Sequence, residues 1–325
     1  MSTTRRQFLQ GAVASGAALS LGTAPAVQAR PNLTLPPKAV GLLYDSTLCI
    51  GCKACVSACK ESNNLPPEFS TAENLWDTPQ DLSGRTKNII KAYKDGNATQ
   101  KDREIDGHAF IKHSCLHCVD PSCVSACPVS AMKKDPVTGI VTYNEKDCIG
   151  CRYCVVACPF GIPRFEYDKA FPKIVKCELC NHLKPGDKFK YSACAQVCPT
   201  GATLYGPVDQ LLQEAKRRVA LKPGSVTRVE RGRVGSGDIY EAKLTAQYLP
   251  RVYGDRELGG TQVLKISAVP MEKLGMPELP ERSFASVSET LQHDLYGWLA
   301  LPAVVLGGLV IAAKRTARPD EEDEA

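Results

Sequence analysis

The sixteen cysteines of this 325-residue chain fall into four groups of four, with none left over. The groups are Cys49, Cys52, Cys55 and Cys59; Cys115, Cys118, Cys123 and Cys127; Cys148, Cys151, Cys154 and Cys158; and Cys177, Cys180, Cys194 and Cys198. Their spacing is C-x2-C-x2-C-x3-C, or a variant of it in which only the second gap is longer. Any fold of this chain has to bring the cysteines of these groups together around the ligands that they bind.

This spacing is typical of loops that hold a cubane iron–sulfur cluster. Three thiolates on one tight loop reach three corners of the cube, and a cysteine from a distant run has to reach the fourth. In paired clusters, the run C-x2-C-x2-C-x3-C-P therefore lends its last cysteine to the other cluster. Pro128, Pro159 and Pro199 follow the last cysteine in three of the groups, and Gly51 and Gly150 allow the loop to curl closely around a cluster. We therefore predict that all sixteen cysteines bind four [4Fe–4S] clusters.

Three other uses of cysteine fit the sequence less well. A disulfide framework favours dispersed cysteines rather than repeated C-x2-C pairs. Zinc sites built from two C-x2-C pairs leave the third cysteine and the x3-C-P ending without a role. Haem attachment needs C-x-x-C-H, whereas His117 lies inside the pair formed by Cys115 and Cys118. Iron–sulfur binding is the prediction that accounts for every cysteine.

An internal repeat predicts how the groups are arranged. YDSTLCIGCKACVSAC begins at Tyr44 and YNEKDCIGCRYCVVAC at Tyr143, and a short β-prone run precedes each copy. Residues 131–143 contain two strand-like segments around a turn, which joins groups two and three. Residues 199–205 match the start of the same hairpin, and residues 40–43 are their only candidate partner. The predicted fold class is α+β, with two bacterial-ferredoxin-like units that each hold two [4Fe–4S] clusters, groups two and three being inserted between groups one and four, plus one C-terminal transmembrane helix.

Exchange of the last cysteine between paired groups gives four predicted ligand sets. Set 1 is Cys49, Cys52 and Cys55 with Cys198; set 2 is Cys177, Cys180 and Cys194 with Cys59; set 3 is Cys115, Cys118 and Cys123 with Cys158; and set 4 is Cys148, Cys151 and Cys154 with Cys127. One cysteine for every iron corner leaves no iron open to a substrate. We therefore predict an electron relay with no catalytic residue, and a cluster site that performs substrate chemistry is the alternative.

The charge balance agrees with bound clusters. Between Arg30 and Pro319 the chain carries 38 basic and 30 acidic side chains. An oxidised [4Fe–4S] core with four thiolates carries roughly two negative charges, so four of them would offset this excess. The predicted counter-charges are the basic residues near the cysteines, namely Lys53, Lys60, Lys112, Arg152 and Lys176. A nucleic-acid partner is not predicted, because the sequence has no Lys/Arg run or aromatic–basic motif.

Both ends of the chain indicate export and attachment to a membrane. Residues 1–29, with Arg5 and Arg6 before a weakly apolar run, resemble a twin-arginine signal peptide, which directs folded proteins across the membrane. The 19 residues Leu295–Ala313 carry no charge and are nearly long enough to span a hydrocarbon core of roughly 30 Å. The alternatives are a membrane anchor at the N-terminus and a buried core helix at the C-terminus. Basic residues follow the apolar run, so the positive-inside rule places the tail in the cytoplasm.

The predicted outline has five parts, given by residue numbers. They are a signal peptide at 1–29, a four-cluster core at 30–206, an extension packed on the core at 207–292, a transmembrane helix at 293–315 and an acidic cytoplasmic tail at 316–325. A helix is predicted at Gln210–Val219, because its apolar residues lie on one face. The cluster core is expected on the periplasmic side of the bacterial cytoplasmic membrane.

The order of several motifs resembles a known family. These motifs are LYDSTLCIGC, HCVDPSCVSACPVSAMKKDPVTGIV, CRYCVVACPFGIP, KCELCN and YGDRELGGTQVL. Together with the twin-arginine signal and a single C-terminal span, they resemble the HybA-type ferredoxin subunits of membrane-bound uptake [NiFe]-hydrogenases. The cluster motifs are shared by a wider group, the four-cluster electron-transfer subunits of molybdoenzymes such as formate dehydrogenase and dimethyl sulfoxide reductase.

The resemblance implies the same crossed pairing, of group one with group four and of group two with group three. It also implies that the protein relays electrons between a periplasmic [NiFe]-hydrogenase and an integral membrane quinone-reactive subunit. The alternative is the electron-transfer subunit of a molybdoenzyme such as formate dehydrogenase or a polysulfide or sulfoxide reductase. The signal peptide favours the hydrogenase type.

Overall fold

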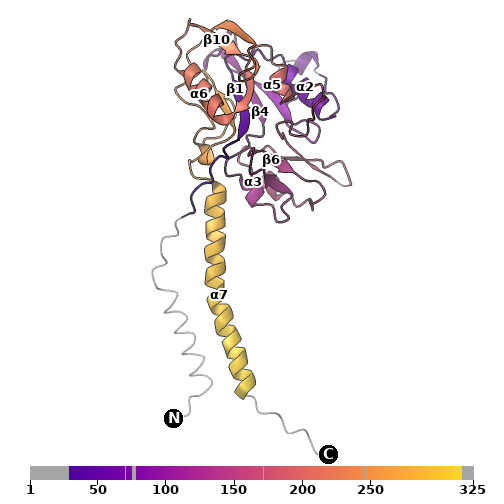
Figure 1. Cartoon of the computed structure of the whole chain (residues 1–325), viewed down its shortest axis with the longest axis vertical. Coiled ribbons are helices and arrows are strands. Elements are labelled where there is room, and N and C mark those ends of the chain that lie inside the picture. The colour runs from indigo at the N-terminus through magenta and orange to yellow at the C-terminus, as the bar shows by residue number, and fades with distance from the viewer. Residues whose placement is uncertain (1–28, 70, 75–77, 171, 245, 317–325) are drawn as a thin grey trace, which may run out of the picture. The chain divides into compact units, whose positions relative to one another are not determined.

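A computed structural model describes residues 29–69, 71–74, 78–170, 172–244 and 246–316 (Figure 1). The predicted signal peptide, apart from Ala29, and the tail beyond residue 316 lie outside the described residues. Residues Asn32–Ala285 form one compact unit, and the described residues on either side of it belong to a second unit. The two units are described separately below.

A four-stranded sheet organises the larger unit. Its order is β11 (Gly232–Arg233), β9 (Thr203–Pro207), β1 (Val40–Asp45) and β13 (Val263–Ile266). β1 pairs with β9 in antiparallel orientation and with β13 in parallel orientation. The pairing of β1 with β9 confirms the predicted partnership between the strand before group one and the run after group four. β11 and β13 come from the predicted extension, so this segment completes the sheet of the cluster core.

The two faces of this sheet serve different purposes. Leu43, Leu204 and Leu264 pack on one face against α6 (Val208–Val219). Leu42, Tyr44 and Val263 point to the other face and belong to the apolar core that surrounds the cysteines. This alternation follows from the two-residue period of a strand. α6 confirms the predicted helix and begins two residues earlier.

A second sheet lies within the segment between groups one and two. Its order is β2 (Asn88–Lys94), β4 (Gly107–Ser114) and β3 (Gln100–Lys101), with β2 and β4 antiparallel. Ile89, Ile90 and Ile111 of this sheet are almost fully buried. The structure packs this segment into the core around the cysteines.

Four short helices present the third cysteine of each group. They are α2 (Ala54–Ser62), α3 (Ser122–Ser125), α4 (Tyr153–Val156) and α5 (Ala193–Gln196). α2 packs on α5, which brings group one to group four (Figure 1). α3 packs on α4, which brings group two to group three.

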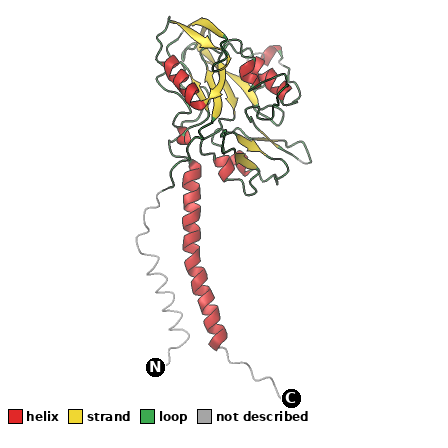
Figure 2. Cartoon of the chain, in the orientation of Figure 1, coloured by secondary structure: helices red, strands yellow, loops and turns green. Residues whose placement is uncertain are grey.

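Short hairpins and turns complete the larger unit. The predicted hairpin between groups two and three is present as β5 (Met132–Lys134) and β6 (Val141–Tyr143). The other elements are β7 (Arg164–Phe165), β8 (Ile174–Val175), β10 (Val226–Glu230), β12 (Ile239–Lys243) and the 3-10 turns η1 (Ala72–Asn74) and η2 (Glu257–Gly259). β7 pairs with β8 and β10 pairs with β12 (Figure 2).

The long helix α7 (Phe284–Thr316) makes up most of the described part of the smaller unit. It starts nine residues before the predicted span at 293–315 and contains Pro302. The part of the chain that the structure describes has one helix, Phe284–Lys314, that is long and apolar enough to cross a membrane. The helix satisfies its backbone hydrogen bonds internally, which is what a membrane-spanning segment requires.

Candidate metal centres

The two CIGC loops have the same backbone conformation. Gly51 and Gly150 have φ values of 69° and 72°, and Lys53 and Arg152 at the starts of α2 and α4 have φ values of 60° and 64°. Two left-handed residues within three positions curl each loop so that its cysteines converge. At Gly51 the requirement is also steric, because an added Cβ atom would lie 2.5 Å from the Phe110 ring.

The cysteines line small cavities in the predicted combinations. One cavity is lined by the four cysteines of set 1, a second by those of set 2 and a third by those of set 4. Burial raises the pKa of Cys118, and the thiolates of Cys158, Cys123 and Cys115 raise it further. This mutual influence indicates that the four cysteines of set 3 are also neighbours. The same set of four thiol donors at each site fits the same kind of cofactor.

The donor chemistry and the spacing both suit a cluster. Among the described residues, no three His, Cys, Asp or Glu side chains are close enough together to hold a single metal ion. Four thiol groups around one cavity match the Cys₄ ligation of a [4Fe–4S] cube. Neither a disulfide nor a compact tetrahedral zinc site would separate the four sulfurs in this way.

Burial makes these thiols poor acids until a metal binds. Burial raises the pKa of Cys55 and Cys177 to about 12, and neighbouring thiolates contribute to both shifts. The pKa values of Cys154 and Cys158 rise to about 11, again mainly through burial. Since metal ligands must be deprotonated, cluster assembly releases protons and depends on positive charge nearby.

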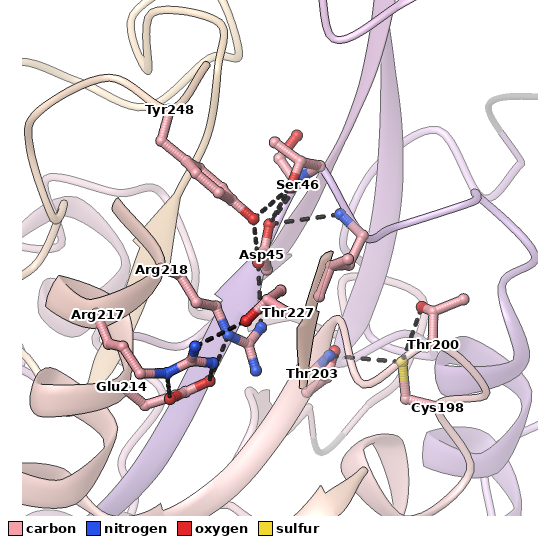
Figure 3. Close-up of polar contacts among 12 residues, drawn as sticks. Asp45, Ser46, Cys198, Thr200, Thr203, Glu214, Arg217, Arg218, Thr227 and Tyr248 are labelled. Atoms are coloured by element: carbon pink, nitrogen blue, oxygen red, sulfur yellow. Dashed lines mark hydrogen bonds and ion pairs between the residues drawn. The ribbon is translucent and has the colours of Figure 1, made fainter. Parts of the chain in front are cut away.

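Hydrogen bonds to sulfur are in place at several sites. Backbone N–H groups of Gly150, Leu179 and Thr203 each donate to a cysteine sulfur over 3.4 Å. Ser62 Oγ donates to the Cys180 sulfur over 3.7 Å. Figure 3 shows the Thr203 contact to Cys198, with the Thr200 hydroxyl on the same sulfur. Such donors stabilise the more negative, reduced form and raise the reduction potential.

The predicted counter-charges take different positions. Lys112 lines the set 2 cavity and Lys53 lines the set 1 cavity. The Nζ of Lys176 donates to the carbonyl oxygens of Val141 and Cys177. Burial raises the pKa of Cys123, and the charge of Lys176 opposes this rise. Positive charge at these three positions offsets that of the nearby thiolates.

The other two predicted counter-charges have additional or different partners. Arg152 lines the set 4 cavity and lies over the rings of Phe165 and Tyr167. Lys60 is a correction to the prediction, because its Nζ forms an ion pair with Glu68 at 2.7 Å. Lys60 follows Cys59 in the sequence, but consecutive helix residues point in different directions, so the Lys60 side chain is directed to Glu68.

Two polar features were not found from the sequence. The Nζ of Lys134 donates to the carbonyl oxygens of Cys118 and Gly139 and to Gln262 Oε1, beside set 3. Burial lowers the pKa of Lys134, and the thiolates of the nearby cysteines oppose this shift. The charge of Lys134 in turn offsets the negative charge of these thiolates. A lysine on a hairpin gives no sequence signal for such a role.

The second feature is a buried ion pair behind set 1 (Figure 3). Arg218 Nη1 donates to Asp45 Oδ2 at 3.0 Å, and the two side chains are 1% and 0% exposed. The Tyr248 hydroxyl donates to the same oxygen over 2.8 Å, and Thr47 donates to Asp45 Oδ1 from both its N–H and its hydroxyl. These bonds fix the turn between β1 and Cys49.

The four sets form a linear series. The thiolate of Cys194 in set 2 raises the pKa of Cys55 in set 1, in addition to burial. In the same way Cys115 of set 3 acts on Cys177 of set 2. The thiolate of Cys154 in set 4 acts on Cys123 of set 3. The packing agrees, because α2 carries Cys55 of set 1 and Cys59 of set 2, Ser114 in the lining of the set 2 cavity precedes Cys115 of set 3, and α3 of set 3 packs on α4 of set 4. The order is therefore set 1, set 2, set 3, set 4, which spacing in the sequence does not reveal.

Comparison with known proteins agrees with this arrangement. Residues 107–208 match the family of 4Fe-4S dicluster domains. The chain is 45% identical over 323 residues to the hydrogenase-2 operon protein HybA of Escherichia coli O157:H7, which covers 98% of this chain and 97% of that protein. It is 32% identical over 287 residues to the formate dehydrogenase-O iron-sulfur subunit of Escherichia coli K12, with 87% and 83% covered. The nitrate-inducible formate dehydrogenase iron-sulfur subunit of the same organism is 36% identical over 182 residues, with 56% and 58% covered. The chain therefore belongs to the HybA family of electron-transferring iron–sulfur proteins, which bind [4Fe–4S] clusters.

Proposed function

We propose that this protein relays electrons between a periplasmic [NiFe]-hydrogenase and an integral membrane quinone-reactive subunit. The observation that carries the proposal is the linear series of four cysteine sets, each next to the following one. Each [4Fe–4S] cluster supplies one-electron transfer when bound. The relation to HybA, whose name refers to a hydrogenase operon, supports a hydrogenase as the electron donor.

In this proposal sets 1 to 4 hold one cluster each, with the crossed pairing given above. The protein supplies four thiolates at each site, N–H donors to sulfur, and buried positive charge. Groups one and four form one ferredoxin-like unit and groups two and three form the other. The contacts of α2 with α5 and of α3 with α4 support this division. The core spans residues 30–206, and the segment 207–292 completes its sheet.

Electrons enter and leave at the two ends of the series. Cys52 in set 1 is exposed, and the adjacent Ile50 is 56% exposed. At the other end Cys148 and Cys151 in set 4 are partly exposed, and Ile149 between them is 66% exposed. No cysteine of sets 2 and 3 is exposed, and these sets contain three and two buried cysteines, whereas set 4 contains one. A partner can therefore approach sets 1 and 4 more closely than the inner sets.

A relay needs no substrate site of its own. Every iron of the four predicted clusters has a cysteine ligand. In set 2 buried cysteines surround a small cavity, which leaves no room for a substrate beside that cluster. A second candidate is the electron-transfer subunit of a molybdoenzyme, which the formate dehydrogenase relatives favour. The higher identity to HybA over nearly the whole chain supports the hydrogenase partner.

The long helix supports attachment to the membrane. In the proposed topology residues 293–315 span the cytoplasmic membrane, the cluster core lies on the periplasmic side, and residues 316–325 lie in the cytoplasm. The twin-arginine signal at 1–29 would export the folded protein with its clusters. The anchor would hold the cluster core beside an integral partner and raise its effective concentration.

Two measurements on the complex test this function. The intact protein, purified without oxygen, should contain about sixteen irons and sixteen inorganic sulfides, as four [4Fe–4S] clusters require. Deletion of the residues after Asp294 should leave the iron content and hydrogen oxidation with a soluble dye unchanged, whereas hydrogen-dependent quinone reduction should fall sharply. Undiminished quinone reduction would show that the membrane relay is wrong. Formate-dependent but hydrogen-independent reduction of the intact protein in membranes would establish the molybdoenzyme alternative.

A further inference from the structure

Lys112 lies where the surroundings of set 1 and set 2 meet. It is on β4, and its register partner on β2 is Ile90. Lys112 lines the set 2 cavity together with Cys59, whereas Ile90 lines the set 1 cavity together with Cys55. Paired residues of two strands point to the same face of the sheet, so this face of the β2–β4 pair borders both sites.

The ammonium group of Lys112 has no ordinary partner. Its side chain is buried, with the residue only 1% exposed, and in the described structure its Nζ makes no hydrogen bond to an oxygen or nitrogen atom. The neighbouring Ser114 Oγ, which lines the same cavity, also lacks a partner there. A buried charge without a partner is costly, so a negatively charged group must face it when the protein is loaded.

The other buried lysines nearby are partnered in a different way. Lys265 Nζ donates to the carbonyl oxygen of Lys112 over 2.7 Å and to Met276 Sδ over 3.0 Å. Lys176 Nζ is held by two carbonyl oxygens beside set 3. Lys60 pairs with Glu68. Lys112 differs from these three because the groups that face it are sulfurs, namely those of Cys194 and Cys59 in set 2 and of Cys55 in set 1.

We propose that Lys112 is a counter-charge shared by the clusters of set 1 and set 2, and that it raises the reduction potentials of both. This inference rests on the proposed electron relay. An electron added to either cluster increases the negative charge near the ammonium group, so the reduced form is stabilised more than the oxidised form. Because one lysine serves both sites, its loss changes two adjacent potentials and leaves sets 3 and 4 as they are.

The test is a reductive titration of the full-length protein, followed by electron paramagnetic resonance. Wild type is compared with Lys112→Met, which removes the charge at similar length, and with Lys112→Arg, which keeps it. Lys134→Met is the matched control, because it removes another largely buried lysine whose ammonium group bonds to residues beside set 3 and to none of sets 1 and 2. Iron and sulfide are counted in every sample, so that failure of the proposed function, which would appear as missing clusters in wild type, is separate from failure of this inference.

Two of the four midpoint potentials should fall in Lys112→Met. A tenfold loss in the equilibrium constant for reduction, about 59 mV for a one-electron couple, is the expected scale for each. Lys112→Arg should restore both potentials towards wild type, and Lys134→Met should leave these two potentials unchanged. Loss of iron from Lys112→Met with full cluster loading of Lys112→Arg would also support the proposal, because the positive charge is what Lys112→Arg keeps and Lys112→Met lacks.

Three results would overturn the proposal. The first is a fully loaded Lys112→Met protein with four unchanged potentials. The second is an equal fall of all four potentials, which would indicate a general loosening of the core. The third is loss of iron from both Lys112→Met and Lys112→Arg, because the site would then depend on the shape of lysine rather than on its charge.

Discussion

Replacement of Arg218 by methionine should strongly destabilise the larger unit, although Arg218 contacts no cysteine. The guanidinium of Arg218 and the carboxylate of Asp45 are 3.0 Å apart and 1% and 0% exposed. Removal of one member of such a pair leaves a buried charge without compensation, which costs about 3–5 kcal/mol. The hydroxyls of Tyr248 and Thr47 still donate to Asp45, so the lower part of this range is expected.

Thermal unfolding measures this effect, with loss of the visible absorbance of the clusters as the signal. A loss of about 3–5 kcal/mol corresponds to a fall in Tm of about 6–20 °C for a unit of this size. Asp45→Asn combined with Arg218→Met should recover most of the loss, because the fully buried carboxylate is then gone and Glu214, the other partner of Arg218, is 21% exposed and keeps its ion pair with Arg217. The matched control is Lys188→Met, which breaks an exposed ion pair with Glu61 and should cost no more than about 1 kcal/mol. A loss in Arg218→Met no larger than that of the control would refute the reasoning.

Two further predictions concern cluster pairing and pH. Cys198→Ser should remove about four irons from set 1 and leave set 2 loaded, as judged by iron content and the remaining paramagnetic signals; loss of the signal assigned to Cys177, Cys180 and Cys194 instead would disprove the crossed pairing. Burial raises the pKa of Asp102 to about 6, although Lys101 opposes the shift, whereas the unfolded value is about 3.9. The stability that Asp102 contributes is therefore present below about pH 4 and is lost as the pH rises through about 6. Asp102→Asn should stabilise the protein at pH 7 by up to about 3 kcal/mol and should have no effect at pH 4. An equal gain at both pH values in chemical denaturation would contradict this assignment.

The sequence by itself determined the features that depend on short-range geometry. The spacing within each cysteine group fixes how many thiolates one loop can present, so the kind of cofactor and the need for a cysteine from another group follow from it. The hairpin at 131–143 and the pairing of the strands on either side of groups one and four were also predictable, and both are present. A strand needs a hydrogen-bonded partner, and few candidate partners were available in the chain.

Only the tertiary structure decided the features that join residues far apart in the sequence. Asp45 and Arg218 meet because α6 packs on the sheet that contains β1. Lys112 faces two cysteine sets because β4 pairs with β2 in one particular register, and a shift of one residue would turn its side chain to the opposite face. Lys60 was wrongly predicted as a counter-charge, since proximity in sequence does not give the direction of a side chain. The linear order of the four sets was hidden for the same reason, because distances between loops depend on how the strands and helices pack and not on the spacing within any loop.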